Sequence, residues 1–144
     1  MKGSFKEIPR LLESNVGLAR NKKLVIISSC ILQKNTEILE PFSDSDTLIL
    51  RSCPEAEHWN IIAYKLASFI SYSKPKQVII ISVEGSPHCV QLHHIAEDIK
   101  KNFIDYRLEH FVLSKNKLWK ISSESVKTSR HLLKIEKLLQ KKEQ

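Results

Sequence analysis

The chain contains three cysteines, Cys30, Cys53 and Cys89, and each one follows an apolar segment with the composition of a buried β-strand. When parallel strands form an open sheet, their carboxyl ends lie along one edge, and ligands bind in the crevice at this edge. We therefore expect three thiols that are distant in the sequence to meet at one edge of the fold. A thiolate is both a metal ligand and a nucleophile, so the cysteines indicate a metal or redox site.

Histidines lie in the same parts of the chain, namely His58, His88, His93 and His94. His93 follows Cys89 by four residues on a predicted helix, so the two side chains share a helix face. The three thiols with His88 or His93 would supply a Cys3His shell for Zn²⁺. Three thiolates could instead hold an iron–sulfur cluster, with the fourth ligand supplied by a histidine or by a partner chain.

Two other interpretations of these residues stay open. Free cysteine is a small apolar residue that is often buried at strand ends, and the chain has no Cys-x2-Cys pair. A thiol-dependent enzyme would also use this cluster, with Cys89 as the nucleophile and His93 or His88 as the base. We expect His94 to be solvated or to cap a helix, and His110 to be structural or surface-exposed.

The elements that would position these residues follow from the apolar pattern. Continuous apolar runs predict strands at 24–29, 47–51, 77–82 and 107–113, with a short edge strand at 118–121. Helical spacing predicts helices at 5–18, 35–39, 54–72 and 87–103, and a last helix after Ser122 or Ser123. Alternating strands and helices predict an α/β protein. We expect a three-layer α/β/α, Rossmann-like fold with a mainly parallel sheet of four to five strands.

The length of 144 residues fits a single α/β domain over 1–144, with a helical extension at 1–22 and a basic helix at 122–144. The net charge of +7 is concentrated at the two ends, because residues 1–23 and 127–144 each carry +4. Basic ends could bind nucleic acid or an acidic protein, so the alternative function is a metal-free interaction module. The low glycine content and the many isoleucines and lysines also suit a heat-adapted protein.

Several compartments and reactions are disfavoured by the sequence. It has no apolar run long enough to span a bilayer and no secretory signal at the start, so we expect a cytoplasmic protein without a membrane partner. An odd number of cysteines argues against a disulfide framework. The segment at 83–87 has a single glycine and no following Lys-Ser/Thr, which excludes a phosphate-binding loop of the P-loop type.

The strand ends resemble those of the small iron–sulfur (delta) subunit of methanogen-type hydrogenase–heterodisulfide reductase systems. The matching stretches are Ser-Ser-Cys at 28–30, Leu-Arg-Ser-Cys at 50–53 and Val-Glu-Gly-Ser-Pro-His-Cys at 83–89, with a weaker match through 107–110. This resemblance implies an iron–sulfur site and a redox accessory or electron-relay role with a larger protein partner. The family has two further cysteines, in the first and third loops, that this chain lacks.

The chain is also similar to beta-class carbonic anhydrases, in which zinc ligands follow the first and third strands. Cys30 and the His88–Cys89 pair occupy compatible positions. That family has Cys-x-Asp-x-Arg and His-x2-Cys, whereas Ile31 and Leu32 follow Cys30 here, so carbon dioxide hydration is not expected. The leading hypothesis is a metal-binding redox module with Cys30, Cys53 and Cys89 as ligands.

Overall fold

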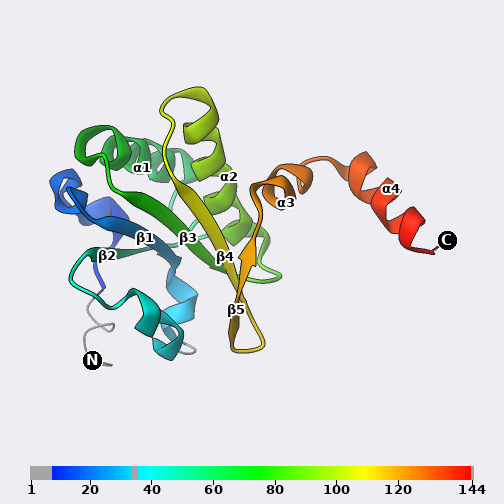
Figure 1. The fold of residues 1–144 in the computed structure, drawn as a ribbon, viewed down its shortest axis with the longest axis horizontal. Helices are drawn as coiled ribbons and strands as arrows, with labels where there is room; N and C mark the ends of the chain where they lie inside the picture. The colour runs from blue at the N-terminus through cyan, green and yellow to red at the C-terminus, as the bar shows by residue number, and fades with distance from the viewer. Residues whose placement is uncertain (1–7, 34–35, 144) are drawn as a thin grey trace.

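The computed structural model describes residues 8–33 and 36–143, and its centre is one five-stranded sheet (Figure 1). The strands are β1 (Lys23–Ser28), β2 (Thr47–Ser52), β3 (Gln77–Val83), β4 (Leu108–Ser114) and β5 (Lys117–Ile121). Their order across the sheet is β2-β1-β3-β4-β5. The first four strands pair in parallel and β5 pairs antiparallel with β4. The predicted α/β fold with a mainly parallel sheet is confirmed.

Both faces of the sheet are covered, which explains why the central strands are apolar along their whole length. On one face, the helices α1 (Trp59–Ser73) and α2 (Pro87–Asn102) pack against alternate residues of β1 and β3, such as Ile26 and Ile80. The opposite face is covered by the short 3-10 segments η4 (Ser29–Gln33) and η5 (Thr36–Phe42). Each face therefore has its own apolar core.

The start of α1 differs from the expectation. A helix from Pro54 is predicted by the sequence, but α1 begins at Trp59. Ahead of it, the N–H groups of Ala56 and Glu57 donate to the Cys53 carbonyl at 3.1 and 2.8 Å, which makes a turn at the strand end. The carboxylate of Glu57 folds back to accept the Cys53 N–H at 3.0 Å, so this turn is tied to β2 rather than to the helix.

The amino-terminal segment also differs, since we expected one helix over 5–18. Residues 5–7 lie outside the described residues. The rest forms two short 3-10 turns, η2 (Leu11–Glu13) and η3 (Val16–Ala19). The side chain of Asn15 accepts the Gly17 N–H at 2.8 Å and starts the second turn, which interrupts any continuous helix. Both turns pack on α1, with Leu11 fully buried.

The carboxyl-terminal segment forms two helices where one was expected. Ser122 caps α3 (Ser123–Thr128), as predicted, and a turn then leads to α4 (Leu132–Glu143). Figure 1 shows α4 extending away from the sheet, and the side chains of Leu132 and Leu133 are 80% and 68% exposed. No helix among the described residues is long and apolar enough to cross a membrane.

We predict that Ile62→Ala lowers the free energy of unfolding by about 2–5 kcal/mol, because Ile62 is fully buried between α1 and the sheet. Ile61 precedes it on the same helix and is 49% exposed, so Ile61→Ala serves as the matched control. That control should change the free energy by less than about 1 kcal/mol. Urea unfolding followed by circular dichroism measures both values, and equal losses would contradict the assignment of the core.

Candidate functional site

The candidate site lies where the strand order reverses direction. From β1 the chain continues to β2 on one side, crosses back through α1, and adds β3 on the other side of β1. In open α/β sheets the crevice at the carboxyl ends of two such strands is the usual ligand site. Cys30 lies in η4 directly after β1, and Cys89 lies in the first turn of α2 after β3. Cys53 follows β2.

Cys30 and Cys89 lie side by side at this edge of the sheet. Burial raises the pKa of the Cys30 thiol, and the neighbouring Cys89 raises it further through its charge and a side-chain hydrogen bond. Cys53 is close enough to contribute a smaller electrostatic effect to the same pKa. The Cys89 side chain is buried, whereas Cys30 and Cys53 are half-buried. The structure therefore brings two predicted site thiols together and leaves the third nearby.

A row of three serines crosses the sheet at this edge. Ser28 pairs in register with Ser52, and Ser82 follows the last β1–β3 pair, Ile27 with Ile81, so the serines are neighbours on three adjacent strands. Ser52 donates to Glu57 at 3.1 Å, and Ser82 bonds to His93. The buried Ser28 hydroxyl has no hydrogen-bond partner within the described part of the chain.

Glu57 anchors the loop that carries Cys53. Its carboxylate accepts hydrogen bonds from the Cys53 N–H, the Ser52 hydroxyl and the Arg10 guanidinium, with Arg10 Nη2 at 2.8 Å. Burial alone would raise the pKa of Glu57, but these hydrogen bonds and the Arg10 charge hold its pKa below the ordinary value. An ionised Glu57 thus fixes the backbone of Cys53 at the end of β2.

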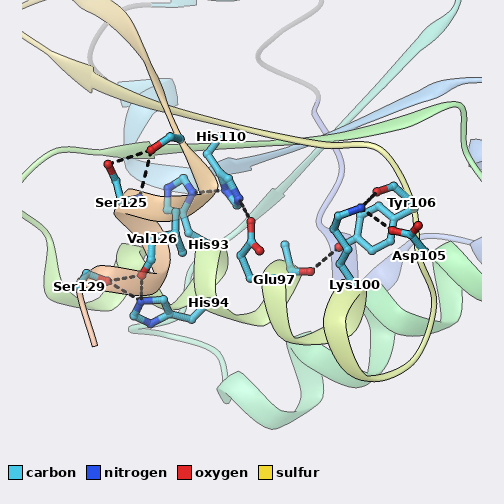
Figure 2. Close-up of polar contacts among 12 residues, drawn as sticks. His93, His94, Glu97, Lys100, Asp105, Tyr106, His110, Ser125, Val126 and Ser129 are labelled. Carbon is cyan, nitrogen blue, oxygen red and sulfur yellow. Dashed lines mark hydrogen bonds and ion pairs between the residues drawn. The ribbon is translucent and has the colours of Figure 1, made fainter. Parts of the chain in front are cut away.

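A buried chain of hydrogen bonds joins α2 to the sheet, and Figure 2 shows the part that runs from His93 through His110 to Glu97. Ser82 Oγ lies 2.6 Å from His93 Nε2, and His93 Nδ1 lies 2.9 Å from His110 Nδ1. His110 Nε2 in turn lies 2.7 Å from Glu97 Oε2. The exposed fraction of all four residues is between 1% and 6%. We call this set of Ser82, His93, His110 and Glu97 the imidazole chain.

One proton arrangement satisfies every bond of the imidazole chain. Glu97 accepts from His110 Nε2, and a neutral His110 then accepts at Nδ1 from His93, whose Nε2 accepts the Ser82 hydroxyl proton. Burial, then the charges of His110 and His94, lowers the pKa of His93 to about 3. Burial also lowers the pKa of His110, although Glu97 opposes the shift. Both imidazoles are therefore neutral at neutral pH.

The two histidines that the sequence proposed as ligands lie in different surroundings in the structure. Both ring nitrogens of His93 are already hydrogen-bonded inside the protein. His88 is exposed at the start of α2, one residue before Cys89. His94 bonds to Val126 O and Ser129 Oγ at the end of α3, which is the capping role expected for it.

Across residues 8–33 and 36–143, no three His, Cys, Asp or Glu side chains are already arranged to hold a metal ion. A metal centre at the thiols would therefore require their side chains to move together.

Sequence reasoning missed Ser28, Glu57, Ser82, Glu97 and His110 as parts of this region. Two features of the sequence could have identified Glu97 and His110. Glu97 follows His93 by four residues, so it shares that helix face, and His110 is a polar residue within a strand. The pairing of His93 with His110 depends on the packing of α2 on β4, which no spacing in the sequence reveals.

We predict that the protein loses stability as the pH falls below about 6.5, because the unfolded histidines then bind protons that folded His93 does not bind until about pH 3. The contribution of His93 to the free energy of unfolding is fully present above about pH 6.5. Between pH 6.5 and 5, this residue alone should lower the free energy of unfolding by about 2 kcal/mol. Urea unfolding at pH 7, 6 and 5 measures this loss. His93→Gln should flatten the pH dependence, and the exposed His131→Gln should retain it. The same slope in both variants would contradict the prediction.

Comparison with known proteins gives a family for this arrangement of strands and helices. A sequence profile of the Rossmann-like domain matches residues 16–144, which includes the whole sheet and all four α-helices described above. No curated protein and no solved structure gives a significant match to the chain. The chain belongs to the Rossmann-like domain family.

Proposed function

We propose that this protein is a small Rossmann-like module that binds zinc or an iron–sulfur cluster through Cys30, Cys53 and Cys89, and that it serves as a redox accessory of a larger protein. The observation that carries the proposal is the contact of Cys30 with Cys89 at the strand-order reversal, with Cys53 within electrostatic reach. In the proposed centre, residues from three separate strand ends would supply soft ligands at one edge of the sheet.

The cost of ionising several neighbouring thiols favours the binding of a cation between them. Burial raises the pKa of Cys30, and each neighbouring thiolate raises it further, so ionising several thiols here is unfavourable without a positive charge. A bound metal ion removes that penalty and displaces the protons. The unpaired Ser28 hydroxyl at the same edge is available to donate a hydrogen bond to a metal-bound thiolate.

The fourth ligand of such a centre is best supplied by His88 or by a partner. His88 is exposed and adjacent to Cys89 in sequence. His93 would have to break two buried hydrogen bonds before it could bind a metal. The half-buried positions of Cys30 and Cys53 leave the site accessible to another protein, which an electron-relay role requires. The resemblance to the small subunit of hydrogenase–heterodisulfide reductase systems supports the same class of partner.

We predict that the protein purified without oxygen contains stoichiometric zinc or iron by elemental analysis. Cys53→Ser should abolish this content while the far-ultraviolet circular dichroism stays unchanged, since Cys53 is not part of a core cluster. His131→Gln removes an exposed histidine far along the sequence and should keep the full metal content. Wild-type protein without zinc or iron, both as purified and after anaerobic reconstitution, would overturn the proposal.

A second candidate, favoured by the exposed helix α4, is a metal-free module that docks on nucleic acid. The exposed lysines of α4 include Lys137 and Lys141, and the helix itself extends away from the sheet (Figure 1). Phosphate contacts make binding salt-dependent, because each contact releases counterions. This function predicts that the double variant Lys137→Glu, Lys141→Glu weakens binding of a labelled single-stranded RNA and reduces its salt dependence.

The matched control for this second candidate makes the same change of charge at two lysines outside α4. Lys76 and Lys101 are also exposed, and they lie outside α4. The double variant Lys76→Glu, Lys101→Glu should therefore bind the RNA as the wild type does. Fluorescence anisotropy at several salt concentrations makes the comparison. Equal weakening by both double variants would indicate a general charge effect and would exclude α4 as the docking element.

A further inference from the structure

We infer that Ser82 and His93 are positioning residues of the thiol site: their hydrogen bond holds α2 against the sheet and so keeps Cys89 beside Cys30. The functional meaning of this inference rests on the proposed metal-binding function. The structural part stands on the contacts of the imidazole chain alone. It assigns His93 a role other than the metal ligand that the sequence predicts.

The imidazole chain connects α2 to two strands at once. His93 bonds to Ser82 of β3 at 2.6 Å and to His110 of β4 at 2.9 Å. One helical turn later, Glu97 bonds to the other nitrogen of His110 at 2.7 Å. A displacement of α2 along the sheet would break these bonds and leave buried polar atoms unpaired, which is unfavourable. The imidazole chain therefore fixes the position of α2 more strictly than apolar contacts do.

The fixed part of α2 is the part that carries Cys89. Cys89 lies one turn before His93 on the same face of the helix, and its side chain is 5% exposed. The other end of the Ser82–His93 bond is on β3, which pairs directly with β1, and Cys30 follows β1 by two residues. One end of this hydrogen bond is thus four residues from Cys89 along α2, and the other end is joined to the strand before Cys30 through the pairing of β3 with β1.

The chemistry of the imidazole chain suits this positioning role. Its two imidazoles are neutral, so they place no positive charge beside the thiols that would compete with a metal ion. The negative charge is on Glu97, at the end of the chain away from Ser82. Residues that orient metal ligands without touching the metal typically change metal affinity by about 10–100-fold when they are removed.

The first experiment measures the contact between the thiols in the metal-free, full-length protein. In a Cys53→Ser background, oxidised glutathione accepts two electrons and two protons from Cys30 and Cys89, which form a disulfide while two glutathione molecules are released. Mass spectrometry follows the rate. We expect Ser82→Ala to slow this reaction about fivefold, the change typical of one lost buried hydrogen bond. Ser82→Thr keeps the hydroxyl group and should restore the rate.

Two control variants separate positioning from general effects. His94 is the next residue on α2, but it bonds to α3 instead of the sheet, so His94→Gln should react at the wild-type rate. Ile62→Ala weakens the core through α1 and should also keep the wild-type rate. Slow reaction in the Ile62 variant, or an unchanged rate in Ser82→Ala, would overturn the inference.

The second experiment titrates Co²⁺ into the proteins with all three cysteines present and follows the thiolate-to-cobalt absorption. Ser82→Ala should bind Co²⁺ about tenfold more weakly, and Ser82→Thr and His94→Gln should match the wild type. The absence of this absorption in the wild type would count against the proposed metal site, while the disulfide rates would still decide the positioning role. Wild-type affinity in Ser82→Ala would overturn the inference and leave the metal site intact.

Discussion

The structure depends on the parallel pairing of β1 with a strand on each side. Lys23 is level with Thr47 of β2 and with Gln77 of β3, so the three strands run in register and end at the same edge. The five residues of β1 after Lys23 are all buried, which makes this strand the centre of both apolar cores. The common edge is the reason that loops from distant parts of the sequence place their thiols on the same side of the sheet.

Along the face covered by α1 and α2, the sheet changes from apolar to polar toward this edge. Leu24 and Ile26 of β1 are followed on that face by Ser28, and β2 and β3 also place serines there. Buried polar groups are costly unless they are paired, and the partners must come from the covering elements. Glu57 supplies one partner before α1 and His93 supplies another on α2. The polar edge therefore restricts how these elements sit on the sheet, because Ser52 and Ser82 each take their partner from one of them.

The sheet could be predicted closely because a continuous apolar run in the sequence marks each of its central strands. The apolar run at 24–29 and the run at 77–82 are each within one or two residues of β1 and β3. The predicted helix at 87–103 also begins at the correct residue, Pro87, which Ser86 caps. The helix predictions that were wrong concern segments in which a side chain binds backbone N–H groups and so competes with helical hydrogen bonding. Glu57 draws the turn after β2 away from α1, and Asn15 divides the amino-terminal segment.

The sequence by itself determined the fold class, the strand positions and the gathering of Cys30, Cys53 and Cys89 at one edge, since these follow from apolar periodicity and from the direction of parallel strands. Only the tertiary structure decided which side chains meet. It placed Cys89 beside Cys30 and enclosed His93 between Ser82 and His110. Such contacts depend on the rotation and position of α2 on the sheet, and these are set by packing between residues that no sequence spacing relates.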